Sequence, residues 1–272
     1  MEAQSKHVQL SEVKLHYLEW EHGGGTPLVI LPGLAGSAHN WSHIADALAG
    51  DRRVLVIEER GQGLSEWKPE YRLDVFVREL GEFADALGLD FFALLGASLG
   101  GRVAYRFAAR NPGRLEKLII IDITPARPHP EAELPAKEHT ESFEGPQDAL
   151  EALRRLGSTV DEVFFKDRFA HNYRRRPDGR YVHAHDPLLA HQTVAELRAL
   201  KIDDHHSLAK IEVPTLIVHG ERSSTSLEEL SRVADAIPDA TLVDIPDAGH
   251  AVHLDNPAGL LAALRTSLSR DR

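Results

Sequence analysis

The sequence predicts an α/β protein with a doubly wound, mostly parallel sheet of eight strands. Short apolar runs alternate with segments of helical spacing through the first 125 residues and again after residue 210. Helices between successive strands favour parallel pairing, because parallel neighbours need a long crossover connection. One strand, tight turn and helix in series, at residues 91–110, carries the most specific motif of the chain.

The expected elements follow from these runs and from the glycine and proline residues between them. The expected strands cover residues 8–10, 13–20, 27–31, 53–57, 91–95, 118–123, 214–219 and 240–245. The expected helices of this α/β part cover residues 40–49, 73–87, 102–110, 227–237 and 257–268.

The alternation stops in the middle of the chain. Residues 126–209 contain no apolar strand but show helical segments near 147–156, 160–174 and 187–200, with a Pro-Asp-Gly-Arg turn signal at 177–180. We therefore expect a core domain made of residues 1–125 and 210–272. Residues 126–209 are expected to form a mostly helical cap over the end of the sheet.

Composition excludes several classes of protein. The chain has 272 residues, 42% of them hydrophobic, and a formal net charge of −11. Its basic residues are scattered, which argues against nucleic acid or an anionic membrane surface as partner. It has no cysteine, and therefore neither a disulfide framework nor a cysteine nucleophile.

The N-terminus lacks the apolar segment of a secretion signal, and no apolar run is long enough to span a bilayer. We expect a soluble, cytoplasmic protein, monomeric or homodimeric, that acts on a small molecule.

The segment 91–110 predicts an exposed, reactive serine. An apolar strand is followed by Gly96-x-Ser98-x-Gly100 and then by an alanine-rich helix. A serine at the tip of such a strained turn has close neighbours on both sides, where only glycines fit. The motif alone is weak evidence for a reactive serine, but the strand before it and the helix after it make it typical of a nucleophile.

Four motifs in order resemble those of the α/β-hydrolase superfamily with a cap. They are Leu-Pro-Gly-Leu at 31–34, Glu-x-Arg-Gly-x-Gly-x-Ser at 58–65, the Gly-x-Ser-x-Gly turn at 96–100, and Asp-Ala-Gly-His at 247–250. The resemblance covers almost the whole chain. It implies acyl-transfer chemistry at Ser98 and implies no metal and no organic cofactor.

The resemblance also assigns the other roles. His250 stands where family members carry the catalytic base, and imidazole can take the serine proton and return it to the leaving group. The backbone amides of Leu34 and Leu99 are the expected oxyanion-hole donors. Most of the family has His-Gly where this chain has Pro32-Gly33, a change that keeps the donor on Leu34.

The acid of the triad departs from the commonest pattern. The loop that usually carries it reads Gly-Glu-Arg-Ser-Ser-Thr-Ser at 220–226 and contains no aspartate. Asp122 lies at the end of the strand that is expected beside the turn. Some α/β-hydrolases, including a C–N bond hydrolase of vitamin B6 degradation with a similar Asp-x-Thr-Pro segment, take their acid there. We interpret Asp122 as the acid. The alternatives are a structural aspartate with Glu221 in the role, or an incomplete triad in a ligand-binding protein.

Ser98 also limits the reaction. Dehalogenases and most epoxide hydrolases of this fold need an aspartate at its position. The expected activity is hydrolysis of a carboxylic ester, thioester or lactone. The alternatives are an amide, another C–N or a C–C bond next to a carbonyl, or ligand binding without catalysis.

Overall fold

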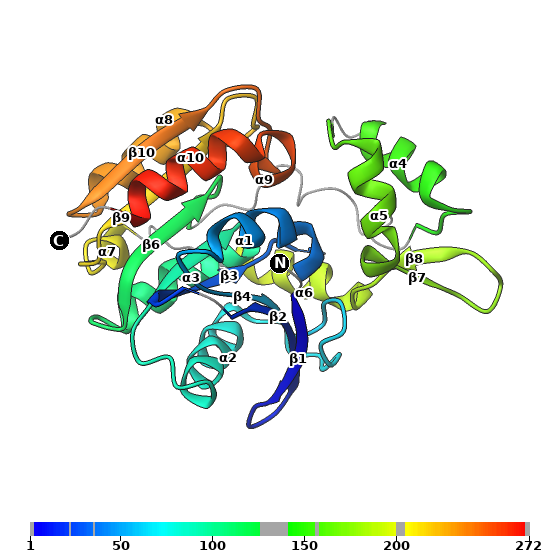
Figure 1. The fold of residues 1–272 in the computed structure, drawn as a ribbon, viewed down its shortest axis with the longest axis horizontal. Coiled ribbons are helices and arrows are strands. Elements are labelled where there is room, and N and C mark those ends of the chain that lie inside the picture. Colours follow the sequence, from blue (N-terminus) through cyan, green and yellow to red (C-terminus); the bar gives the residue numbers. More distant parts are fainter. Residues whose placement is uncertain are drawn as a thin grey trace.

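A twisted eight-stranded sheet forms the centre of the molecule, with the strand order β1-β2-β4-β3-β5-β6-β9-β10 (Figure 1). The computed structural model describes residues 3–21, 23–34, 36–125, 141–155, 158–199 and 205–269. Strands β3 to β10 of this sheet pair in parallel, and β2 runs antiparallel to β1 and to β4. The predicted fold class is therefore confirmed. The strands are β1 (Gln4–Gln9), β2 (Lys14–Trp20), β3 (Gly25–Leu31), β4 (Arg52–Glu58), β5 (Phe92–Ala97), β6 (Leu115–Ile121), β9 (Thr215–Gly220) and β10 (Ala240–Ile245).

Helices cover both faces of the sheet, which explains why its central strands are apolar on both sides. Alternate residues of β3, such as Val29 and Leu31, pack toward α2, α3 and α8, while Leu28 and Ile30 pack toward α1 and α10. No helix in the described ranges is long and apolar enough to cross a membrane. The bounds are η1 (Ala38–Trp41), α1 (Ser42–Leu48), α2 (Leu73–Ala86), α3 (Leu99–Arg110), α7 (His205–Leu208), α8 (Leu227–Ala236), α9 (Val252–Asp255) and α10 (Pro257–Leu268).

Between β6 and β9 lie α4 (Pro146–Arg155), α5 (Glu162–Asn172), a hairpin of β7 (Tyr173–Arg175) and β8 (Tyr181–His183), and α6 (Pro187–Ala199). The prediction of a helix over 160–174 is wrong at its C-terminal end. Its last residues form the first strand of the hairpin, whose turn is the predicted Pro-Asp-Gly-Arg segment. Residue 126, where the insertion was expected to begin, lies outside the described residues.

Helices α4 and α5 and the hairpin, here called the α4–β8 lobe, have a small aromatic core of their own beside the main body (Figure 1). Phe169 stacks on Tyr173 with ring centroids 4.6 Å apart, and Phe165 meets Phe169 edge-on. The lobe is tied to η1 by Arg168, whose Nε donates to the carbonyl of His39 at 3.0 Å, and by paired side-chain amides of Asn40 and Asn172.

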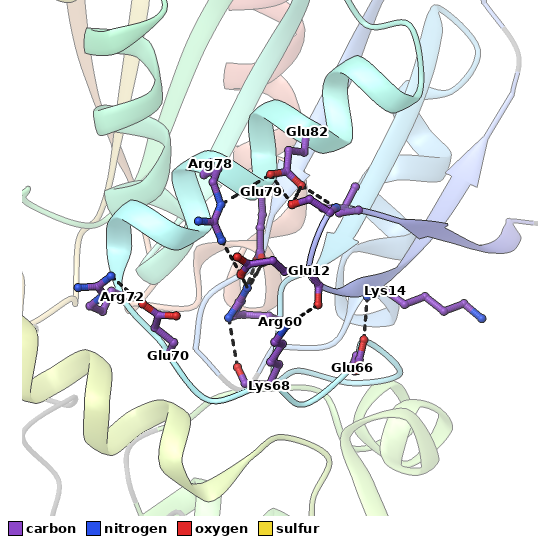
Figure 2. Close-up of polar contacts among 12 residues, drawn as sticks. Glu12, Lys14, Arg60, Glu66, Lys68, Glu70, Arg72, Arg78, Glu79 and Glu82 are labelled. Carbon is purple, nitrogen blue, oxygen red and sulfur yellow. Dashed lines mark hydrogen bonds and ion pairs between the residues drawn. The ribbon is translucent and has the colours of Figure 1, made fainter.

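A buried ion pair holds the segment after β4 against α2 (Figure 2). Nε of Arg60 donates to both carboxylate oxygens of Glu79, at 2.9 and 3.0 Å, and Nη2 donates to the same carboxylate. Nη1 donates to the carbonyl of Lys68 at 3.3 Å. A bidentate carboxylate compensates for the lost hydration of a guanidinium, so Arg60 is accommodated at this depth as a cation.

The neighbouring carboxyl group of Glu59 is buried without a comparable cation. Gln62 donates to its Oε2 at 3.4 Å, and within the described parts of the chain its Oε1 has no hydrogen-bond partner. Burial, followed by the charge of Glu79, raises the pKa of Glu59 to about 8. This carboxyl group is therefore protonated in the folded protein at neutral pH.

The raised pKa of Glu59 predicts a pH-dependent stability. Between about pH 4.5 and 8 the folded state keeps a proton that the unfolded chain has lost, so this contribution to the free energy of unfolding falls as pH rises. Urea unfolding across this range should show a smaller decline for Glu59→Gln than for wild type. The exposed Glu21→Gln is the control and should follow wild type. Equal slopes for wild type and Glu59→Gln would contradict the assignment.

Candidate active site

Ser98 lies at the tip of a strained turn between β5 and α3. Its backbone angles are φ 51° and ψ −116°, a sparsely populated region for a residue with a side chain. A Cβ on Gly96 would lie 2.4 Å from the carbonyl oxygen of Gly100, and one on Gly100 would lie 2.4 Å from that of Leu31. The glycines are therefore needed for the close approach of strand and helix, as the motif predicts.

The turn after β3 passes directly beside this serine. A Cβ on Gly33 would lie 3.0 Å from the Cβ of Ser98, and the amide of Gly100 donates to the carbonyl of Pro32 at 3.2 Å. Leu99 is the first residue of α3, so its amide has no carbonyl of the preceding helical turn to bind. The structure thus brings the two turns that carry Leu34 and Leu99 together around Ser98.

The register of the sheet places Asp122 next to Ser98. Ala97, the last residue of β5, is paired with Ile121, the last residue of β6. Ser98 and Asp122 are the next residues after these two, so they lie at the ends of adjacent strands. The amide of Ser98 donates to the carbonyl of Ile121 at 3.3 Å. Adjacent strands lie about 4.8 Å apart, so the two side chains leave the same edge of the sheet as neighbours.

Asp122 binds His250 through a short hydrogen bond. Nδ1 of His250 lies 2.7 Å from Oδ2 of Asp122, whose side chain is fully buried. His250 belongs to the loop between β10 and α9. Its preceding residue, Gly249, donates its amide to Oδ2 of Asp255 at 2.8 Å, which fixes the loop.

The carboxylate of Asp122 accepts from several other donors, all from the end of β9 and the loop after it. The amide of Gly220 donates to Oδ1 at 3.2 Å, Thr225 Oγ1 donates to Oδ2 at 3.2 Å, and Ser223 Oγ donates to Oδ2. A buried carboxylate needs such donors to replace its hydration. The aspartate-free loop at 220–226 therefore serves the carboxylate on the neighbouring strand.

Ser223 and Thr225 were not predicted in this role. The structure directs their hydroxyl groups to the carboxylate of Asp122. Four consecutive hydroxyl residues, at 223–226 of a loop without aspartate, were the available signal. Glu221, the alternative acid, accepts from the amide of Asp247 at 2.9 Å.

Several other histidine, aromatic and arginine residues lie in the packing of the molecule or on its surface. His253 stacks on Trp41 with centroids 4.1 Å apart, and burial lowers its pKa to about 3. The lobe aromatics pack on one another in their own core, and Arg174 to Arg176 are exposed. Across the described ranges, no three His, Asp or Glu side chains form a group that could hold a metal ion.

The chain is similar in sequence to several known proteins. The N-formylmaleamate deformylase of Pseudomonas putida is 27% identical over 271 residues, which cover 94% of this chain and 93% of the relative. An sn-1-specific diacylglycerol lipase of Danio rerio is 27% identical over 255 residues, covering 90% of this chain and 79% of the relative.

A solved structure of similar fold is that of E-2-(acetamidomethylene)succinate hydrolase. It superimposes with a TM-score of 0.86 at 22% identity and covers 99% of this chain and 100% of its own. The family described as alpha/beta hydrolase fold matches residues 26–257. The chain therefore belongs to the α/β-hydrolase family.

Proposed function

We propose that this protein is a serine hydrolase that cleaves a carboxylic ester, thioester or lactone through an acyl-enzyme at Ser98. The observation that carries the proposal is the 2.7 Å hydrogen bond between Asp122 and His250, formed at the strand end next to the strained turn of Ser98. A serine hydroxyl needs such a base to become a nucleophile.

In the proposed reaction each of these groups has one role. His250 uses Nε2 to take the proton of Ser98 Oγ as the oxygen attacks the carbonyl carbon, and Asp122 stabilises the imidazolium that forms. The amides of Leu34 and Leu99 bind the oxyanion. His250 then protonates the leaving alkoxide or thiolate. In the second half of the reaction His250 takes a proton from water as the water attacks the acyl-enzyme, and it returns that proton to Ser98 Oγ as the bond to the acyl group breaks.

The lipase relative supports an ester as the substrate, because an sn-1-specific diacylglycerol lipase cleaves esters. A C–N bond is the second candidate. It is favoured by the deformylase relative and by the structural similarity to the acetamidomethylene succinate hydrolase. Turnover of a p-nitrophenyl ester against the matched p-nitroanilide separates the two.

We assign the role of a cap to residues 126–209. The contacts of Arg168 and Asn172 with η1 hold the α4–β8 lobe against the segment that follows the Leu34 turn. The lobe then limits access to Ser98, and its side chains select the substrate. The proposed enzyme acts on a small molecule in the cytoplasm.

A fluorophosphonate probe tests the nucleophile directly. Wild type should gain one phosphonate per chain in intact-mass measurements, because the probe reacts with an activated serine. Ser98→Ala should gain none, and the exposed Ser11→Ala should behave like wild type. A folded wild type that stays unlabelled would favour a ligand-binding protein, which would be stabilised by its ligand without turnover.

Loss of the acid should slow turnover while preserving the fold. Asp122→Asn keeps the size of the side chain but not its charge, and it should lower kcat on the order of 10²–10⁴. Thr225→Val removes one donor to that carboxylate and should cost roughly tenfold or less, and Thr225→Ser should recover the loss. If Asp122→Asn keeps wild-type kcat, Asp122 is structural and another carboxylate, such as Glu221, is the acid.

A further inference from the structure

Arg102 lies on α3, the helix that begins directly after Ser98, one turn beyond this serine. Cβ atoms on Gly100 and Gly101 would meet Leu31 and Ile123, so these two residues face the sheet. At about 100° per residue, the Cα–Cβ bond of Arg102 leaves α3 on the side away from the sheet. Helical side chains lean toward the N-terminus, which here is the end that carries Ser98.

This side chain is buried without a counter-charge. Arg102 is only 2% exposed, and among the residues that the structure describes neither Nη1 nor Nη2 has a hydrogen-bond partner. Burial, followed by the charge of Arg106, lowers its pKa to about 9, so it is still a cation at neutral pH. Arg60, another buried arginine, has the usual counter-charge, because its guanidinium donates to the carboxylate of Glu79 (Figure 2).

An unpaired buried guanidinium destabilises a folded protein, because its hydration is lost and nothing replaces it. Such a cost is typical of groups that bind a ligand, where stability is given up for function. The cation also lies near the N-terminus of α3, whose free amides carry a partial positive charge. In a chain of net charge −11, both the guanidinium and this helix end attract anions rather than cations.

We propose that Arg102 binds a carboxylate of the substrate, and that the substrates of Ser98 are therefore anionic acyl compounds. A carboxylate fits the planar fork of a guanidinium with two parallel hydrogen bonds. It would supply the partner that the free protein lacks. The inference rests on the proposed function, because it makes Arg102 a specificity residue for the acyl transfer at Ser98.

Binding is tested apart from turnover, in the Ser98→Ala background with glutarate as the probe. Glutarate should raise Tm of Ser98→Ala and leave Tm of Ser98→Ala/Arg102→Met unchanged. Without glutarate, Arg102→Met should unfold at the same or a higher temperature, because methionine fills the space without an unpaired charge. The surface variant Arg110→Gln, in the Ser98→Ala background, is the matched control and should keep the glutarate shift.

Turnover is tested with mono-p-nitrophenyl glutarate against p-nitrophenyl pentanoate, which lacks the carboxylate. Wild type should prefer the glutarate ester in kcat/KM. Arg102→Met should reduce this preference by about tenfold to a hundredfold, mainly through KM, and Arg110→Gln should retain it.

The outcomes separate the two proposals. An unchanged preference in Arg102→Met, or a loss of Tm in that variant without glutarate, overturns the carboxylate site and leaves the hydrolase proposal standing. A glutarate shift that depends on Arg102, in a protein that cleaves neither ester, supports the site and overturns the hydrolase proposal. Absence of both the shift and turnover overturns both.

Discussion

The hydrogen bond between the buried carboxylate of Asp122 and the ring of His250 is the interaction on which the site depends. A fully buried carboxylate is costly unless donors surround it. Here the donors come from the end of β9 and the loop after it, and from the histidine loop after β10. The four neighbouring strands β5, β6, β9 and β10 must therefore pair in the correct register for the site to form.

Close packing imposes the second constraint. The chain passes Ser98 so closely that Gly96 and Gly100 have no room for a Cβ, and one on Gly33 would lie only 3.0 Å from the Cβ of Ser98. The same feature occurs at the histidine loop, where a Cβ on Gly220 would lie 2.3 Å from the carbonyl oxygen of Gly249. Backbone contacts of this kind hold the turn of Ser98 and the loop of His250 close to their neighbouring segments.

Much of this arrangement could be predicted from the sequence, since apolar runs and glycine turns mark buried strands and their ends. The strand at 240–245 and the helix at 257–268 have the expected bounds. The hairpin at 173–183 was missed because Tyr173 continues the spacing of aromatic residues on the preceding helix, and only tertiary packing separates the two. The Pro-Asp-Gly-Arg signal marks the turn at 177–180, but it does not reveal that the residues on either side of it form strands.

The partners of Asp122 and the isolation of Arg102 could not be predicted, for a common physical reason. The first depends on which segments meet at one edge of the sheet, and the second on which side chains pack over the outer side of α3. Hydroxyl groups or a single arginine have no periodicity that reveals either. Thr225 and Asp122 are far apart in the chain but share a hydrogen bond. Arg102 looks from its sequence context like an ordinary helical residue, and only its burial without a partner distinguishes it.

The proton on Nδ1 of His250 tests the central claim most directly, because a histidine hydrogen-bonded to a carboxylate gives a proton NMR signal far downfield of the amide region. The account predicts this signal in the folded wild type and its loss or a large upfield shift in Asp122→Asn, with the remaining spectrum unchanged. A downfield signal that persists unaltered in folded Asp122→Asn would contradict the account, since another group would then hold the histidine.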